Sequence, residues 1–556
     1  MHLNHRVSLA LLGCALACAC AAPIVRVGQP DLRPSPPVIE QLVDLGGLPL
    51  PDTGSISREE SDGVLTPGEW VAVLGQGLDE GNKSLVTVDG AAVEIKGHLQ
   101  GGSLLVQVPR RLAPRQMHQL AVSTPLGKAA FSFNVKSYVI AADTDGKVLH
   151  FLPMEPGAKT ALSKSAEDIE LKQAYLHTLS PGGAWLYLVQ ATGALGSEQA
   201  VQSEVAVVHM GAHKHPRLSG SFSVQTAASP TAVAMLDENT LLVLSEKDLI
   251  VCDVRGGSGR QIGRLDLPTT SGKSAYIDVE ALAHGVALVL EAYGNAVTLI
   301  DLSDLRQPRV TTKLDVGADK GVPWSIDLVP DPDDNSSVWL LQGPNLRISG
   351  NKVSRYAATL AEKTKDALGM KSAESGSVKG EKTTPDKPLQ ESYSRLVHIR
   401  AGAAGLMIAG ERTLPSDLFP FFLLAQPNGE LLVSGVSSNV FQFAGLPRSI
   451  DGVKTAVDIL TNSLQFGRIV RIRADGSAEP VVKGPALYFN LDALSDGTLV
   501  YSVIRPGFSV LPPSLEVEWG VESVGKSDAD QAYRRLVELE WTAIIPPYTL
   551  GMLSVQ

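Results

Sequence analysis

The sequence predicts an all-β protein, and three observations support this fold class. From about Gly63 onward, short apolar runs that alternate with polar residues are separated by glycine, the pattern of strands joined by tight turns. One five-residue apolar strand then recurs along the rest of the chain. The composition, with 44% hydrophobic and 19% charged residues over 556 residues, supplies enough apolar side chains for two or three folded domains.

The recurring strand has five β-prone residues and each time follows a turn or loop. It occurs at residues 147–151, 204–208, 248–252, 296–300, 395–399, 468–472 and 535–539. Hairpins of two apolar runs around a turn lie between these strands, with turns at residues 179–188, 234–239, 281–285, 328–334, 425–429 and 493–497. A repeat of roughly 45 to 50 residues with about four strands is typical of a β-propeller blade, because each such sheet buries its faces only by stacking on its neighbours.

The seven recurring strands predict a seven-bladed β-propeller over residues 137–556, with six or eight blades as the alternatives. The first recurring strand has no hairpin before it. We therefore expect the C-terminal segment, around residues 542–554, to supply the missing inner strand of the blade that begins at residues 138–152. Closure of this kind removes exposed sheet edges, which otherwise invite aggregation.

The first 22 residues have the pattern of an export signal. His5 and Arg6 precede an apolar run over residues 7–17 that ends in small residues. This run is too short to span a bilayer. We therefore expect an exported protein.

The signal segment also contains a sequence typical of lipidation. Leu11-Leu12-Gly13-Cys14 resembles a bacterial lipobox, in which the cysteine is lipidated and becomes the new N-terminus. This resemblance implies a lipoprotein anchored to the outer membrane, periplasmic or at the cell surface, with Cys14 as the favoured anchor. Two alternatives stay open: lipidation of Cys18 or Cys20, or plain cleavage near Ala19 or Ala21.

Composition divides the chain before the propeller into two parts. Residues 23–62 are rich in proline, which predicts an extended, semi-rigid tether. Residues 63–136 predict a small β-sandwich. Within the propeller, residues 351–390 are rich in Lys, Glu, Ser, Thr and Ala with very few large apolar residues, so we interpret them as a low-complexity insertion.

The predicted sandwich resembles a known family. Its segments read LTPGE, VAVLG, VTVDG, LLVQVP, LAVSTPLG and FSFNV, at residues 65–69, 71–75, 86–90, 104–109, 120–127 and 131–135. In this order they resemble an IPT/TIG domain. The resemblance implies an immunoglobulin-like sandwich that serves as a spacer or binding module, and it implies no catalytic residue.

The propeller part resembles the bacterial YVTN-like and quinoprotein-like propellers. Residues 141–151 read AADTDGKVLHF, in which Asp145 and Gly146 set a turn before a strand as in quinoprotein blades. The pattern is not repeated in later blades, and His150 stands where those enzymes have tryptophan. We therefore expect no quinone and no other cofactor.

Possible metal ligands are better explained as turn residues. His209, His213 and His215 form the densest imidazole cluster, but they follow a strand where a turn is needed and no spaced acid or cysteine accompanies them. The run of acidic residues at 331–335 offers oxygen ligands for calcium, yet Asp, Asn and Pro are also the residues of tight turns. Cys252 lies in an alternating strand and is interpreted as a buried structural thiol. We expect no metal site.

The axial mouth is the usual binding site of a propeller, because the loops of all blades converge there. The candidates for lining it are Tyr175, Ser229, Asp278, Ser325, Phe421 and Asn490. No nucleophile elbow, phosphate-binding glycine loop or His-x-x-Glu pair stands in a suitable context, so no catalytic residue is assigned.

Charge limits the range of partners. The net charge of -11 and the absence of a basic stripe with interleaved aromatics argue against nucleic acid. We therefore expect a cell-envelope binding or scaffold protein, held at the membrane by a lipid anchor only, that presents its propeller to proteins or polysaccharide, as in a secretion, adhesion or motility machine. The alternative is a propeller-class enzyme, a lactonase, lyase or glycosidase acting at the axial pocket.

Overall fold

The structure is a computed structural model. It describes residues 24–25, 35–44, 56–57, 65–79, 83–99, 102–110, 112, 117–142, 147–154, 169–172, 174–190, 201–210, 216–255, 258–268, 276–291, 295–317, 324–343, 394–402, 405–437, 467–484, 487–493, 498–506, 515–523 and 553–555. Within these ranges the regular elements are β-strands and the short 3-10 helix η3 (Pro427–Gly429). None of the described segments forms a helix of the length and apolarity that a bilayer crossing requires. The prediction of an all-β protein is confirmed for this part of the chain.

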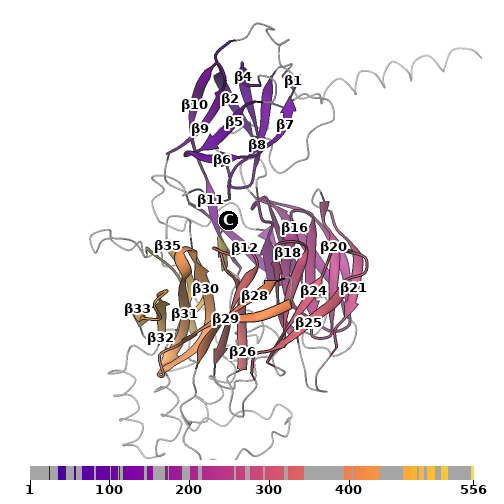
Figure 1. Ribbon diagram of the computed structural model, residues 1–556, viewed down its shortest axis with the longest axis vertical. Coiled ribbons are helices and arrows are strands. Elements are labelled where there is room, and N and C mark those ends of the chain that lie inside the picture. The colour runs from indigo at the N-terminus through magenta and orange to yellow at the C-terminus, as the bar shows by residue number, and fades with distance from the viewer. Residues whose placement is uncertain are drawn as a thin grey trace, which may run out of the picture.

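The N-terminal part contains two four-stranded sheets packed face to face (Figure 1). The strand order of one sheet is β2-β4-β8-β7 and that of the other is β10-β9-β5-β6. A short pair, β1 (Ile24–Val25) and β3 (Ile56–Ser57), lies outside these sheets. The bounds are β2 (Val38–Asp44), β4 (Trp70–Gln76), β5 (Leu85–Val88), β6 (Ala91–Val93), β7 (Ile95–Leu99), β8 (Ser103–Gln107), β9 (Met117–Thr124) and β10 (Gly127–Asn134).

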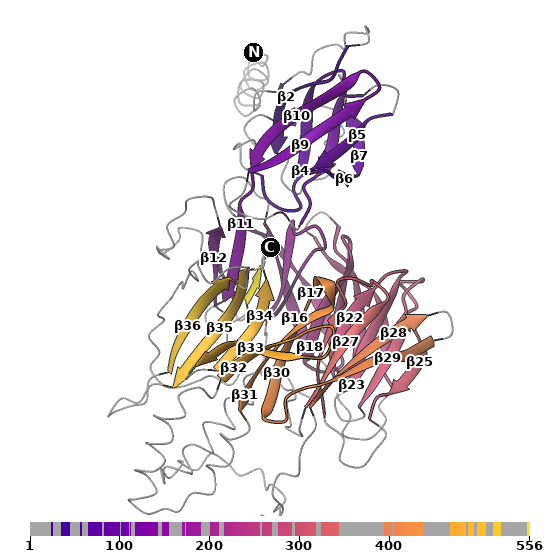
Figure 2. The ribbon, with the colours of Figure 1, turned by 60° about the vertical axis from the view of Figure 1, so that its left-hand side comes forward.

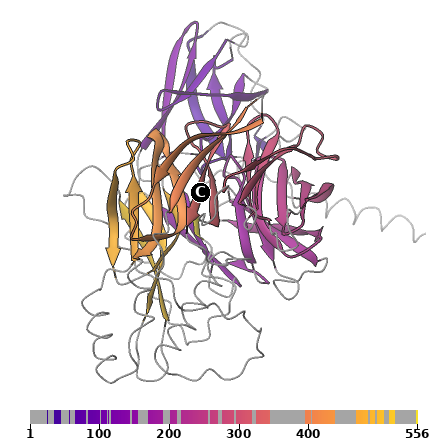
Figure 3. The same ribbon diagram turned by 60° about the horizontal axis from the view of Figure 1, so that its bottom comes forward.

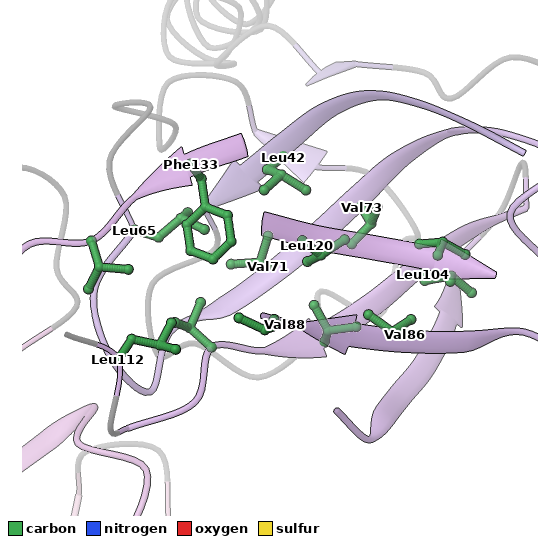
Figure 4. Packing of buried hydrophobic residues seen from close by; sticks show 14 of the residues in the cluster. Leu42, Leu65, Val71, Val73, Val86, Val88, Leu104, Leu112, Leu120 and Phe133 are labelled. Carbon is green, nitrogen blue, oxygen red and sulfur yellow. The ribbon is translucent and has the colours of Figure 1, made fainter. Parts of the chain in front are cut away.

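Alternating side chains of both sheets form one hydrophobic core (Figure 4). Val71 and Val73 of β4 face Val86 and Val88 of β5, and Phe133 of β10 closes one end of this core. Side chains on the other faces are covered to different degrees: Thr87 of β5 is half-buried, whereas Ala72 of β4 is buried in a second small cluster with Val43 and Leu105.

One sequence prediction in this region is wrong. The proline-rich segment 23–62 was expected to be an unpacked tether, but its residues Val38–Asp44 form β2, which pairs antiparallel with β4. Leu42 and Val43 of this strand are buried. The prolines at 36 and 37 end before β2 begins, so they leave its backbone donors available for the ladder.

From Ser137 onward the described residues form seven sheets, of which six have four strands and one has three. The first has the order β37-β11-β12-β13, and in the next five, beginning with β14, β18, β22, β26 and β30, four consecutive strands pair in sequence order. The last is β34-β35-β36. The bounds are β11 (Ser137–Ala142), β12 (Val148–Met154), β13 (Ile169–Glu170), β14 (Ala174–Leu179), β15 (Trp185–Gln190), β16 (Val201–His209), β17 (Arg217–Thr226), β18 (Pro230–Asp237), β19 (Thr240–Ser245), β20 (Asp248–Asp253), β21 (Arg260–Asp266), β22 (Tyr276–Leu282), β23 (Val286–Glu291), β24 (Ala296–Asp301), β25 (Arg309–Asp315), β26 (Trp324–Pro330), β27 (Ser337–Gly343), β28 (Arg395–Gly402), β29 (Gly405–Thr413), β30 (Leu418–Gln426), β31 (Glu430–Ser437), β32 (Gly467–Ile472), β33 (Ala478–Gly484), β34 (Leu487–Ala493), β35 (Thr498–Pro506), β36 (Leu515–Ser523) and β37 (Leu553–Val555).

Successive sheets stand side by side in a ring (Figures 2 and 3). The first strands contact each other in the series β14, β18, β22, β26, β30, β34 and β37. A shared core that includes Tyr138, Phe151, Leu186 and Leu188 joins the first sheet to the second, so the series closes. Radial four-stranded sheets in a closed ring are the architecture of a β-propeller.

The ring closes through the two ends of its chain. β37 supplies the innermost strand of the first sheet by pairing antiparallel with β11, at Val139 with Val555, Ile140 with Ser554 and Ala141 with Leu553. This is the pairing that the sequence predicted. Of the segment expected to provide it, only the last part lies within the described residues.

The recurring strand of the sequence is the third strand of its sheet. Six of its seven copies lie in β12, β16, β20, β24, β28 and β32. The seventh, at 535–539, lies outside the described residues, and the third position of the last sheet is held by β36. All six predicted hairpins connect a first strand to a second one.

The two faces of the ring differ. The sandwich lies over the face that carries the hairpins between first and second strands, which we call the near face (Figures 1 and 2). The amide of Gly182, in the β14–β15 turn, donates to the Glu238 carboxylate in the β18–β19 turn, and Gln107 of the sandwich lies against Gly182. The opposite face, the far face, carries the beginnings of the first strands. Two of the long connections, 344–393 and 438–466, start and end on this far face because they join second strands to third strands.

Candidate binding face of the ring

Each first strand from β14 to β34 has a β-bulge near its start, on the far face. The register shifts lie between Ala174 and Leu176, Pro230 and Ala232, Tyr276 and Asp278, Ser325 and Asp327, Pro420 and Phe422, and Phe489 and Asp492. A bulge leaves a residue out of the ladder and redirects its side chain, and bulges are frequent beside functional sites.

The six axial candidates all map to this repeated bulge. Tyr175, Phe421 and Asn490 are residues that the ladder skips, Asp278 and Ser325 flank a bulge, and Ser229 directly precedes β18. Ser229, Asp278, Ser325 and Phe421 are buried, Asn490 is half-buried with a left-handed φ of 49°, and the side chain of Tyr175 lies outside the described residues. The structure therefore places the candidates at one end of the ring and packs four of them between sheets. A ligand-binding role for them stays a prediction.

Asp278 links two neighbouring sheets. One carboxylate oxygen accepts the amide of Val279 at 3.1 Å, and the other accepts the amide of Leu328, on the next first strand, at 3.0 Å. Asp327 repeats the second contact one sheet later by accepting the amide of Leu423 at 2.9 Å. Each aspartate is the first paired residue after its bulge, so the two contacts are equivalent.

Asp327 was not among the predicted site residues. The sequence does contain a signal for it, because Ile277-Asp278-Val279 and Ile326-Asp327-Leu328 repeat the same apolar-Asp-apolar triplet in successive first strands. In the preceding sheet Thr231, inside its bulge, donates to the carbonyl of Tyr276 at 2.9 Å. The bulges therefore serve as links between sheets at three successive joints.

Replacing Asp278 and Asp327 by alanine is expected to destabilise the ring. Each change leaves a buried backbone amide without its acceptor, which costs about 1–3 kcal/mol. The sites are adjacent, so we expect the double variant Asp278→Ala/Asp327→Ala to lose roughly 3–5 kcal/mol of unfolding free energy in urea. Asp304→Ala, at an exposed near-face turn, is the control, and a double variant as stable as this control would contradict the assignment.

Ser325 belongs to a second polar link between the same sheets. Its amide and hydroxyl contact the Asn295 side-chain oxygen at 3.1 and 3.2 Å, and Gln342 donates to its hydroxyl at 3.2 Å. Gln342, which is fully buried, accepts a hydrogen bond from Arg395 at 2.8 Å. These contacts satisfy buried polar groups and fix the start of β26 against the neighbouring sheet.

Two further acids at this end of the ring are buried and paired. Glu291 contacts the Lys313 ammonium at 2.5 Å, and burial, reinforced by the Glu291 charge, raises the pKa of Tyr276 to about 12. Asp248 accepts the amide of Ala227 with both oxygens at 3.0 Å and pairs with Arg264 at 3.1 Å. Carboxylates held by backbone amides and cations in this way stabilise loops.

The predicted imidazole cluster is only partly described. His209 is the buried last residue of β16 and stacks on Trp185 with ring centroids 4.5 Å apart. Burial lowers the pKa of His209 to about 4, with a smaller contribution from Arg217. His213 and His215 lie outside the described residues, as do Cys14, Cys18 and Cys20. Among the described side chains, no group of three or more His, Cys, Asp or Glu is arranged to hold a metal ion.

The acidic loop after β26 is a hydrogen-bonded turn. Asp331 accepts the amide of Asp333 at 2.9 Å, and Asp334 accepts the amide and hydroxyl of Ser336 at 3.0 and 2.6 Å. Arg400 pairs with the second oxygen of Asp334 at 2.8 Å. Its carboxylates therefore have partners within the protein, as the interpretation of this loop as a turn requires.

The acidic loop makes the free energy of unfolding depend on pH. The hydrogen bonds from Ser336, aided by Arg400, lower the pKa of Asp334 from 3.8 to about 2. Because the folded-state pKa is below the unfolded value, the ionised carboxylate adds stability above about pH 4, and this is lost as the pH falls through about 2. We expect Asp334→Asn to flatten the acid limb of the unfolding free energy, and Ser336→Ala to flatten it only in part, because the Ser336 amide and Arg400 still hold the carboxylate. An unchanged slope in Asp334→Asn would contradict this.

Cys252, the cysteine within the described residues, is buried as the sequence predicted. Cys252 is free and fully buried in β20, and burial raises the pKa of its thiol to about 12. A protonated, enclosed thiol is a packing residue.

No protein-family model matches this chain, and no curated protein does. Among solved structures, a protein from Lactobacillus plantarum is similar at 11% identity and a TM-score of 0.41, covering 75% of this chain and 99% of that one. The periplasmic gluconolactonase of Pseudomonas aeruginosa is 14% identical with a TM-score of 0.35, covering 80% and 96%. A quinonprotein alcohol dehydrogenase-like protein from Bacteroides thetaiotaomicron is 12% identical with a TM-score of 0.35, covering 82% and 90%. Similarity at this level assigns no function.

Proposed function

We propose that this protein is an exported, lipid-anchored envelope protein whose seven-bladed propeller is a binding platform for protein or polysaccharide partners. Its N-terminal sandwich is proposed to be an immunoglobulin-like IPT/TIG spacer. The single observation that carries the platform role is the asymmetry of the ring. The sandwich stands over the near face, at the β14–β15 and β18–β19 turns, while the far face carries all the bulged strand ends and the strand ends that connections 344–393 and 438–466 join.

The contacts at the bulges favour binding over catalysis. A general acid or base needs a carboxyl group that can reach a substrate and exchange its proton. Asp278 and Asp327 instead accept backbone amides of the next sheet and are buried. The far face therefore presents its loops on a rigid support, which is how propeller platforms bind partners.

The second candidate is an enzyme of the lactonase, lyase or glycosidase type that acts at the axis. One observation favours it: polar groups gather where bulges redirect side chains, and Asn490 has a left-handed backbone beside Asp492. Turnover of a lactone or glycan that is abolished by Asn490→Ala, with the fold intact, would support this candidate.

The test of the platform role is crosslinking from each face in the native envelope. A photocrosslinking amino acid is placed at Lys247 or Ser416, exposed in far-face turns, and at Asp304 on the near face as the control. We expect defined adducts from the two far-face positions and none from Asp304. Adducts from Asp304 alone, or from no position, would overturn the proposal. Intact-mass analysis of the N-terminus tests the lipid anchor separately.

A further inference from the structure

The outer end of the sandwich, which points away from the propeller, carries exposed apolar side chains. Val38 at the start of β2, Leu85 at the start of β5 and Leu126 in the β9–β10 turn are 51%, 52% and 43% exposed. We call these three residues, with the exposed Lys83 and Lys128, the distal tip. Of the four large apolar side chains exposed in the described part of the sandwich, three lie at this end, and the fourth, Met117, lies at the inner end.

The strand directions place these residues together. Thr124 pairs with Gly127 at the outer end of the β9–β10 hairpin, and Leu85 pairs with Ser123, which in turn pairs with Lys128. Gly127 faces Pro36 and Pro37, which lead directly into Val38. The opposite end of the sandwich adjoins the propeller (Figure 2): β10 ends there at Asn134, shortly before β11, and Gln107 at the end of β8 lies against Gly182.

The course of the chain identifies what the distal tip contacts. Residue 35 leads into β2 at this same end, so the segment that carries the export signal and Cys14 joins the folded part at the tip. Twenty residues lie between Cys14 and Ser35, so an anchor at Cys14 attaches the folded part to the membrane from the side of the tip. Lys83 and Lys128 suit the anionic surface of a bilayer. Of the nearby acids, Glu40 accepts a hydrogen bond from the neutral Gln76 amide at 3.0 Å, and Asp79 lies 2.9 Å from His98.

We propose that the distal tip docks on the lipid surface, with Val38, Leu85 and Leu126 inserted at the headgroup boundary. This proposal rests on the lipid anchor of the proposed function, and it adds how the protein is oriented relative to the membrane. The acylated cysteine attaches one end of the chain to the membrane, and apolar and basic residues at the tip add a second contact with the same surface. Because the sandwich stands over the near face, tip docking directs the far face away from the membrane, toward its partners.

The test measures how deeply each of the two ends of the sandwich enters the membrane. The full chain is labelled with an environment-sensitive dye at Leu126→Cys or at Met117→Cys, which is 70% exposed at the inner end of the same β9 strand. The lipidated protein is reconstituted in phosphatidylethanolamine–phosphatidylglycerol vesicles that contain brominated lipid. We expect quenching and a blue shift at position 126 and neither at 117. Equal quenching at both positions, or none at 126, would overturn the proposal.

A second measurement separates tip docking from the anchor. Chains with Cys14, Cys18 and Cys20 replaced by serine are floated with the same vesicles, with and without Val38→Ser/Leu85→Ser/Leu126→Ser. We expect the triple variant to reduce the bound fraction roughly tenfold, and Met117→Ser to leave it unchanged. Equal binding with and without the triple variant contradicts tip docking. An unlipidated native N-terminus would instead remove the anchor and leave this measurement valid.

Discussion

Removal of residues 553–556 is expected to open the ring and to lower its stability more than any single substitution. β37 contributes three ladder positions to the first sheet, against Val139, Ile140 and Ala141 of β11. Its loss exposes the edge of β11, together with the side chains of Tyr138 and Ile140 that the closed ring buries. We expect a loss of about 3–5 kcal/mol and a thermal midpoint lower by several degrees, with aggregation at concentrations where the intact chain stays monomeric.

Calorimetry and light scattering check this prediction directly. Gln556→Ala leaves residues 553–555 in place and is the control. A peptide with the sequence of residues 550–556, added in excess, should recover part of the lost midpoint because it can pair with β11. A truncated chain with an unchanged midpoint would show that β37 does not close the ring.

The sequence predicted the ring well because the third strands are buried on both faces. Residues 248–252 and 296–300 therefore form continuous β-prone runs, and such runs are easy to recognise when they recur along a chain. The six hairpin turns were equally visible, since turn residues at fixed distances from apolar runs have few alternatives. The seventh recurring strand is the exception, because Leu515–Ser523 occupies its expected place.

Other features depend on contacts that no local pattern shows. The sequence did not predict β2, because the prolines around it suggested an extended tether. Leu42 and Val43 become buried only when this strand pairs with β4. The axial candidates lie at the far-face ends of the first strands, and the sequence did not show that Asp278 is enclosed by the next sheet. Burial between sheets depends on residues about 50 positions away, as in the contact of Asp278 with Leu328.

Gly68→Ala is expected to detach the sandwich from the propeller. Gly68 has a φ of 83°, and a Cβ added there would lie 1.7 Å from the carbonyl oxygen of Gly182 in the β14–β15 turn. Both groups are backbone, so the clash is relieved only if the sandwich moves. Movement of the sandwich would also separate Gln107 from Gly182 and Arg110 from Glu238. Burial raises the pKa of Glu238, and the Gly182 amide and the Arg110 charge partly offset this rise.

Gly90→Ala is a matched control for this substitution. Gly90 lies in the same domain with a φ of 84°, but a Cβ there meets nothing within 4 Å. Both variants carry the left-handed backbone cost of about 1–2 kcal/mol, and only Gly68→Ala adds the clash. We expect small-angle scattering to show a longer particle, and proteolysis near Lys136 to accelerate at least tenfold, in Gly68→Ala alone. If the two variants behave alike, the sandwich is not held by this contact, and the near face is open to partners as well.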